Sequence, residues 1–103
     1  MPVHDLNSFE DLRGPNLCII DFYATWCQPC HSFKPFYNLM SETHKHSKFF
    51  QVDVDNENLE EIVKYFEISA MPTFIFVRNG NVVAKVMGAD QQQFQATLYS
   101  LLQ

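Results

Sequence analysis

Basic side chains are scarce in this sequence of 103 residues, which has seven Lys and Arg residues against twelve Asp and Glu residues, for a net charge of −5. Proteins that bind nucleic acids present basic surfaces to the phosphates, and this chain has no basic stripe, so we expect no nucleic-acid partner. Long apolar runs are also missing. None approaches the roughly 20 residues that a membrane-spanning helix needs, so we expect no membrane partner.

Cysteines number only three, at positions 18, 27 and 30. Such a small number indicates catalysis or metal binding rather than a framework of structural disulfides. The N-terminus has no basic segment followed by an apolar one, so we expect no signal peptide and a cytoplasmic, reducing location. The length and the 47% hydrophobic content predict a single domain over residues 1–103.

Segments with strand and helix patterns alternate along the chain. Strands are predicted at 17–24, 48–54, 73–78 and 81–87, with a short one at 3–4, and helices at 6–13, 29–46, 57–67 and 90–103. Pro35 should kink the second helix, and Asn79-Gly80 predicts a two-residue hairpin. Strands joined through helices are expected to run parallel, with the closing hairpin antiparallel. The predicted fold is therefore a three-layer α/β/α domain with a mixed sheet.

One stretch, TWCQPCH at 25–31, fits three chemistries: a redox dithiol, a c-type haem attachment site, or part of a zinc site. The motif lies between an apolar strand and a helix, where α/β proteins place chemistry. A structural zinc site needs four ligands, commonly a second C-x-x-C or His pair. The remaining cysteine, Cys18, lies in the apolar strand and is expected to fill the core. We therefore expect no metal and favour the dithiol.

The two cysteines are predicted to have different roles because of their positions on the helix. Cys27 lies at the helix N-terminus, where free N–H groups and the helix dipole stabilise a thiolate. Cys30, one turn further, should be more enclosed and keep its proton. Asp21 stands within the apolar strand, so burial should raise its pKa and let it accept the proton of Cys30. The alternative is a strand-end Asp bonded to backbone amides, and the proton role is favoured because such carboxyls cluster at functional sites.

A family resemblance follows from these motifs together. The segments DFYATWCQPCHSFKP (21–35) and SAMPTFIF (69–76), the Asn-Gly hairpin and MGAD (87–90) resemble the thioredoxin family at its characteristic spacing, over essentially the whole chain. The resemblance implies the thioredoxin fold, with about five strands and about four helices. It also implies a protein dithiol-disulfide oxidoreductase that contributes to electron transport and cell redox homeostasis.

The resemblance assigns roles to individual residues. Cys27 would attack a substrate disulfide, Cys30 would resolve the mixed disulfide, and Asp21 would be the buried proton acceptor. Gln28, Pro29 and Pro72, the last as a cis-proline, would tune the redox site. The substrate surface would consist of Trp26, Met71, Pro72, Gly88 and Ala89. The resemblance also implies that the protein binds no cofactor and that NADPH supplies electrons through a thioredoxin-reductase-type flavoenzyme. Its clients would be disulfide-containing proteins, and the protein itself would be a monomer.

Three positions depart from the usual family pattern. Gln28 replaces Gly between the cysteines, which bears on the redox potential. Gln51 stands where many bacterial members carry a Lys near Asp21, and His31 replaces a commoner Lys or Arg. The alternatives are a binding module without turnover, which the retained cysteines and Asp21 disfavour, and an oxidant or isomerase, for which an export signal is expected.

Overall fold

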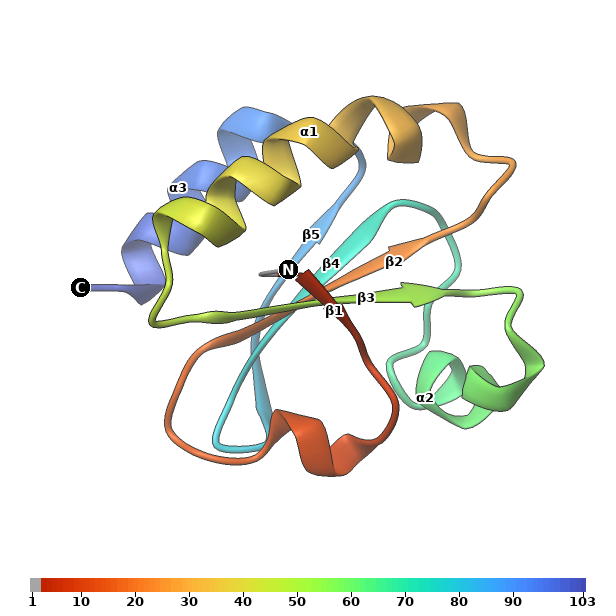
Figure 1. Ribbon diagram of the computed structural model, residues 1–103, viewed down its shortest axis with the longest axis horizontal. Helices are drawn as coiled ribbons and strands as arrows, with labels where there is room; N and C mark the ends of the chain where they lie inside the picture. Colours follow the sequence, from red (N-terminus) through yellow and green to blue (C-terminus); the bar gives the residue numbers. More distant parts are fainter. Residues whose placement is uncertain (1–2) are drawn as a thin grey trace.

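The computed structural model describes residues 3–103, which form three layers around a five-stranded sheet (Figure 1). Helices α1 (Gln28–Thr43) and α3 (Gln91–Leu101) lie together on one face of the sheet. The opposite face carries α2 (Glu60–Tyr65) and the short 3-10 helix η1 (Phe9–Leu12). The predicted three-layer architecture is confirmed, while residues 1 and 2 of the predicted domain lie outside the described part.

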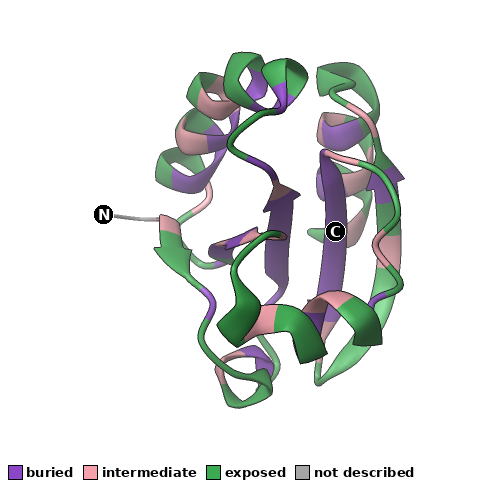
Figure 2. Cartoon of the chain, turned by 90° about the vertical axis from the view of Figure 1, so that its right-hand side faces the viewer, coloured by how far each residue is buried: buried purple, intermediate pink, exposed green. Residues whose placement is uncertain are grey.

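The sheet is mixed, with the spatial order β1-β3-β2-β4-β5. Its strands are β1 (Val3–Asp5), β2 (Cys18–Tyr23), β3 (Lys48–Asp53), β4 (Thr73–Arg78) and β5 (Asn81–Met87). β3 pairs in parallel with both β1 and β2, whereas β4 is antiparallel to β2 and to β5. The central strands are buried on both faces, as Figure 2 shows by their purple colour. This explains why β2 and β4 carry mostly apolar side chains on both faces rather than an alternating pattern, with Asp21 as the charged exception in β2.

Alternation along β2 divides the core between the two faces of the sheet. Ile20 and Phe22 pack with Ile62 and Phe66 from the α2 side. Ile19 packs on the other face with residues of α1 and α3, including Phe33, Tyr37 and Phe94. Because side chains alternate along a strand, Asp21 shares the face of Ile19 and lies under α1.

The first predicted helix, at 6–13, is wrong. Only Phe9–Leu12 is helical, as a single 3-10 turn that begins after Ser8. The N–H of Leu6 donates to the carbonyl of Gln51 at 3.1 Å, so Leu6 continues the pairing of β1 with β3. Leu6 and Leu12 are both buried in the core, which explains the apolar spacing that suggested a helix. Leu6 reaches the core from extended backbone and Leu12 from the 3-10 turn.

Residues 3–103 therefore contain three α-helices instead of about four, and each of the three is shorter than predicted. α1 ends at Thr43, and His44 caps it before a turn into β3. The predicted helix at 57–67 divides into the 3-10 helix η2 (Glu57–Leu59), capped by the Asn56 side chain, and α2. Within residues 3–103, no helix has both the length and the apolar character needed to cross a bilayer.

The direction of β4 also differs from the prediction. β4 follows β3 through a helix, yet it is antiparallel to the neighbouring β2, which is itself parallel to β3. A six-residue helix such as α2 spans only about 9 Å, less than the roughly 20 Å of a six-residue strand. The chain therefore re-enters the sheet at the edge where it left. The end of β2, the start of β4 and the end of β5 consequently meet at one edge.

The hairpin between β4 and β5 agrees with the prediction. Asn79 and Gly80 both have positive φ, 54° and 77°, as a two-residue type I′ turn requires. The β4–β5 pair also has a register shift between Phe76 and Val77, before this turn.

Candidate functional site

The loop after β2 places the two cysteines at the start of α1. Cys27 is the residue before the first helical turn, and its sulfur accepts a hydrogen bond from the Cys30 N–H at 3.2 Å. The two residues form a disulfide, with Cα atoms 5.3 Å apart. Pro29 occupies the first turn, where a missing N–H is tolerated. A reduced Cys27 would therefore have an N–H donor aimed at its thiolate.

Burial does not separate the two sulfur-bearing residues as we predicted. Cys27 is 5% exposed and Cys30 is 4% exposed. Both belong to one small apolar cluster with Ala24, against which Tyr23 and Met71 pack. The prediction that Cys30 is more enclosed is wrong, because this cluster covers both positions. Their distinct environments come instead from the helix start, which Cys27 caps.

Asp21 is a buried carboxyl group on the face of the sheet that α1 covers. It is 3% exposed, and its Oδ1 has no hydrogen-bond partner among residues 3–103. Burial raises its pKa to about 7, and the nearby charge of Lys34 acts in the opposite direction. The raised pKa expected from the sequence is thus present, and Asp21 can exchange a proton near neutral pH.

Gln51 lies beside Asp21 in the sheet, in register across the β2–β3 pair. Its side-chain amide donates to Asp5 Oδ1 at 2.9 Å. The sheet position beside Asp21, where many bacterial family members carry a lysine, therefore holds a neutral amide that donates to Asp5 of β1.

The segments opposite the dithiol are the loop that precedes β4 and the loop that follows β5. The Met71–Pro72 peptide bond is cis, as the sequence suggested, and Pro72 is buried. The Gly88 N–H donates to the Pro72 carbonyl at 2.8 Å, and Gly88 has a φ of 93°, which favours glycine. Met71 contacts the dithiol cluster, while Ala89 is exposed at the end of β5.

Trp26 is a strongly exposed member of this surface, with a relative exposure of 69%. Its indole N–H donates to Asp55 Oδ2 at 2.8 Å. The Asp55 backbone N–H in turn donates to Asp53 Oδ1 at 3.0 Å. The sequence analysis assigned no role at this site to Asp55 and missed this contact. Its position directly after a strand, at the edge where Trp26 lies, was the signal available.

His31 contacts the same loop from α1. Its Nε2 lies 2.7 Å from the Thr25 carbonyl oxygen, and because a carbonyl can only accept, this nitrogen carries the proton. Gln28 and Pro29 are exposed at the start of the helix. The loop that leads to Cys27 is therefore held by His31 on one side, and by Asp55 through Trp26 on the other.

Cys18 and the remaining histidines lie away from the dithiol. Cys18 is fully buried in the core on the α2 side of the sheet. His44 stacks edge-on against Tyr99, with ring centroids 5.6 Å apart. No three His, Cys, Asp or Glu side chains gather in a metal-binding arrangement within residues 3–103.

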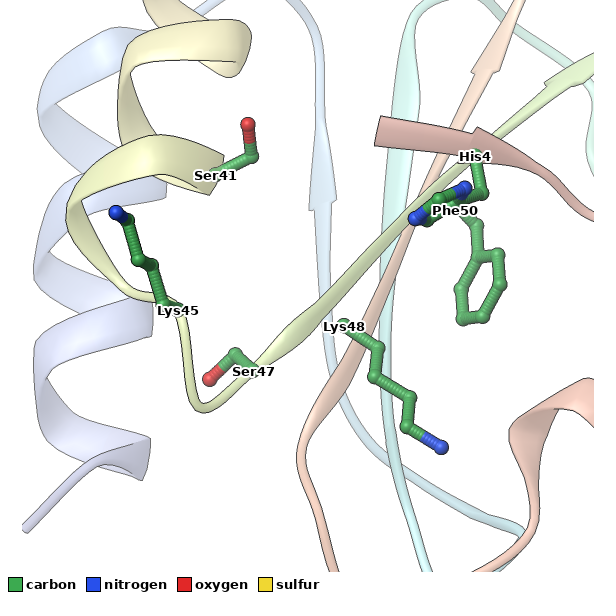
Figure 3. A pocket seen from close by; sticks show the side chains of 6 residues that line it. All are labelled: His4, Ser41, Lys45, Ser47, Lys48 and Phe50. Carbon is green, nitrogen blue, oxygen red and sulfur yellow. The ribbon is translucent and has the colours of Figure 1, made fainter. Parts of the chain in front are cut away.

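A pocket of about 430 Å³ lies at the opposite edge of the sheet, where β3 begins (Figure 3). It is lined by His4, Ser41, Lys45, Ser47, Lys48 and Phe50. The Lys45 and Lys48 side chains extend in different directions and do not converge on one point. This pocket contains no thiol, and the chemistry of the molecule lies at the dithiol edge.

A disulfide is closed across one helical turn, packs against the residue before a cis-proline, and follows a strand with a buried carboxyl that ionises near neutrality. This arrangement is suited to exchanging disulfides with other thiols. Fold and site together define a thiol-disulfide oxidoreductase. The family model described as Thioredoxin matches residues 3–100. The chain belongs to the thioredoxin family.

Individual relatives agree with this membership. Thioredoxin of Oryctolagus cuniculus is 39% identical over 92 residues, which cover 89% of this chain and 86% of the relative. The crystal structure of Malassezia sympodialis thioredoxin is 34% identical, with a TM-score of 0.88 over 97% of this chain and 93% of that one. A chain from a structure concerning the thiol resolving mechanism in yeast mitochondrial 1-Cys peroxiredoxin via glutathione/thioredoxin systems is 26% identical. Its TM-score is 0.87, with coverage of 95% and 94%.

Proposed function

We propose that this protein, as a single domain over residues 1–103, reduces disulfides of client proteins by two successive thiol-disulfide exchanges. The Cys27 thiolate attacks a client sulfur, forms a mixed disulfide and releases the first client thiolate. The Cys30 thiol then attacks Cys27 Sγ, which releases the second client thiolate and leaves the Cys27–Cys30 disulfide. Two electrons pass to the client, and the protein becomes oxidised. The observation that carries the proposal is the Cys27–Cys30 disulfide at the start of α1.

Asp21 is proposed to accept the proton that Cys30 loses during the second exchange, through a water molecule. The burial of Asp21 supports this role, because a carboxyl with a pKa of about 7 is matched to proton transfer near neutral pH. The Cys30 thiol becomes a better nucleophile as the proton moves to the carboxylate.

The client is proposed to bind along the surface around Trp26, Met71, Pro72, Gly88 and Ala89, of which Trp26 and Ala89 are the exposed members. Met71 and Trp26 adjoin the dithiol, and the Pro72–Gly88 hydrogen bond fixes two of the loops relative to each other. An extended client segment would pair with the Met71 backbone, in the manner of an added strand. Gln28, Pro29 and Pro72 are proposed to tune the redox potential.

The protein is proposed to act as a cytoplasmic monomer in electron transport and redox homeostasis. It would bind no cofactor and would be restored by a flavoenzyme of the thioredoxin-reductase type that uses NADPH. The likeness to the chain from the peroxiredoxin study supports peroxiredoxins as one class of client.

Trapping with Cys30→Ser tests this function. We expect the wild type to reduce a protein disulfide catalytically with a reductase supplied, and Cys30→Ser to accumulate a mixed disulfide through Cys27. Cys18→Ala is the matched control, because it removes a cysteine from the core and should trap nothing. If the wild type reduces nothing and Cys30→Ser traps nothing, the chain is a binding module instead.

The role of Asp21 needs a separate measurement of the two steps. Asp21→Asn should slow release of the mixed disulfide more than its formation, because the proton acceptor is needed only when Cys30 attacks. Equal slowing of both steps would remove this role from Asp21.

A further inference from the structure

We propose that Lys34 is a positioning residue that acts through Asp21. Its ammonium group, held over the Tyr23 ring, supplies the positive charge that the sheet lacks beside Asp21, and it thereby sets the pH range in which Asp21 can take the proton of the resolving thiol. The inference rests on the proposed proton-accepting role of Asp21.

Lys34 is placed toward the sheet by α1. It lies two helical turns after Cys27 and is half-buried. Its Nζ lies 4.8 Å from the centroid of the Tyr23 ring, within the range of a cation–π interaction. Tyr23 follows Asp21 by two residues on β2, so the two side chains project from the same face. The ring therefore holds the ammonium group on the side of the sheet where Asp21 is buried.

The neighbouring strands supply no positive charge at this point. Gln51, the register partner of Asp21, is neutral, and its amide is bonded to Asp5. The ion pairs found within residues 3–103, Arg13–Glu10 and Lys64–Glu60, lie on the exposed surface elsewhere. Lys34 forms no ion pair within 4.0 Å among residues 3–103. Its charge therefore acts on Asp21 at a longer range.

Within residues 3–103, the other titratable groups that act on this buried cluster are neutral, acidic or joined in the disulfide. Burial raises the pKa of Tyr23 and, more strongly, that of Tyr37, so both phenols stay protonated at neutral pH. The groups concerned come from four elements. They are Lys34, Tyr37 and the dithiol Cys27–Cys30 at α1, Cys18 and Tyr23 on β2, Asp53 on β3 and Asp5 on β1. Among them only Lys34 favours the carboxylate form of Asp21.

Loss of this charge has a definite consequence for the resolving step. Desolvation favours the protonated form of Asp21, and Lys34 offsets part of that effect. Without Lys34, fewer molecules would hold Asp21 as a carboxylate at neutral pH. Release of the mixed disulfide would then slow at pH 7 and recover at higher pH.

Titration of the Asp21 carboxyl provides the direct test. Its ¹³C resonance would be followed in the oxidised protein, where the disulfide cysteines do not titrate. Lys34→Met should move the midpoint upward by about half a pH unit or more, whereas Lys34→Arg should keep it near the wild-type value. The pH profile for release of the mixed disulfide should move in the same direction. In an Asp21→Asn background, Lys34→Met should cause no further displacement of that profile.

Lys45→Met is the matched control, because it removes the same charge beyond the far end of α1 (Figure 3). The helix between these lysines spans about 15 Å, longer than the screening distance of about 8 Å at physiological salt. This variant should leave the midpoint unchanged.

An unchanged midpoint in Lys34→Met would overturn the inference, even if Cys30→Ser still traps clients and the proposed function stands. A midpoint that moves while Asp21→Asn releases clients at the wild-type rate would refute the kinetic consequence and the role of Asp21 together. An equal displacement by Lys45→Met would refute a local effect and point to net charge.

Discussion

Replacing Asp21 by Asn removes from the folded protein a buried carboxyl that ionises near pH 7. In the oxidised protein, we expect the wild type to lose stability as the pH rises toward 7, and Asp21→Asn to lose much less. The oxidised form is the appropriate one to study, because its disulfide cysteines do not titrate.

The magnitude follows from the difference in proton binding between the two states. The pKa of Asp21 is about 7 in the folded protein, against an ordinary value of 3.8. The unfolded chain therefore releases this proton first, and the folded state binds more protons between the two values. Stability from this group is complete below pH 3.8 and is lost as the pH rises through 7. The slope is about 1.4 kcal/mol per pH unit, so the loss between pH 5 and pH 8 is about 2 to 3 kcal/mol.

Urea unfolding at pH 5 and pH 8 measures this quantity. For each protein, the change in the free energy of unfolding between pH 5 and pH 8 is determined. The change in Asp21→Asn is then compared with that in the wild type, so that packing changes caused by Asn and the titration of the four histidines cancel. Asp90→Asn is the control, because Asp90 is exposed and Asn caps a helix equally well. It should keep the wild-type pH dependence. If Asp21→Asn loses as much stability as the wild type between these pH values, the burial argument for Asp21 fails.

Other perturbations test the packing and the loops around the site. Phe94→Ala should lower the free energy of unfolding by about 3 to 5 kcal/mol, because its fully buried ring packs among several aromatic rings of α1 and β4, whereas Tyr99→Ala on the exposed side of α3 should cost less than about 1 kcal/mol. A loss for Phe94→Ala no larger than that for Tyr99→Ala would contradict this. Gly88→Ala should destabilise by about 1 to 3 kcal/mol because of its positive φ, and an unchanged melting temperature would exclude such strain. Asp55→Ala should lower the fluorescence anisotropy of Trp26, the single tryptophan, by releasing its indole N–H, and equal anisotropy would show that this bond does not restrain the ring.

Local patterns in the sequence predicted much of the fold because they depend on near neighbours. The apolar run before the motif predicted β2, and Asn79-Gly80 predicted a turn whose two residues have positive φ. The C-x-x-C spacing predicted a redox dithiol, and the structure joins its two sulfurs in a disulfide across one helical turn. A carboxyl within an apolar strand predicted a raised pKa for Asp21, since burial alone produces it.

Features that depend on distant segments were decided only by the tertiary structure. The apolar spacing at 6–13 suggested a helix, but pairing of Leu6 with β3 left only one 3-10 turn there. The short α2 reversed the direction expected for β4. Cys27 and Cys30 are equally buried because Ala24, Tyr23 and Met71 surround both.

The same distinction holds for the charges around the site. By itself, the sequence determined that a dithiol would stand at a helix start after a strand that carries a buried carboxyl. It could not show that Lys34 would lie over the Tyr23 ring, or that Asp55 would accept from Trp26, since each pair joins separate elements. The order and register of the strands bring these residues together, and only the folded chain fixes that register.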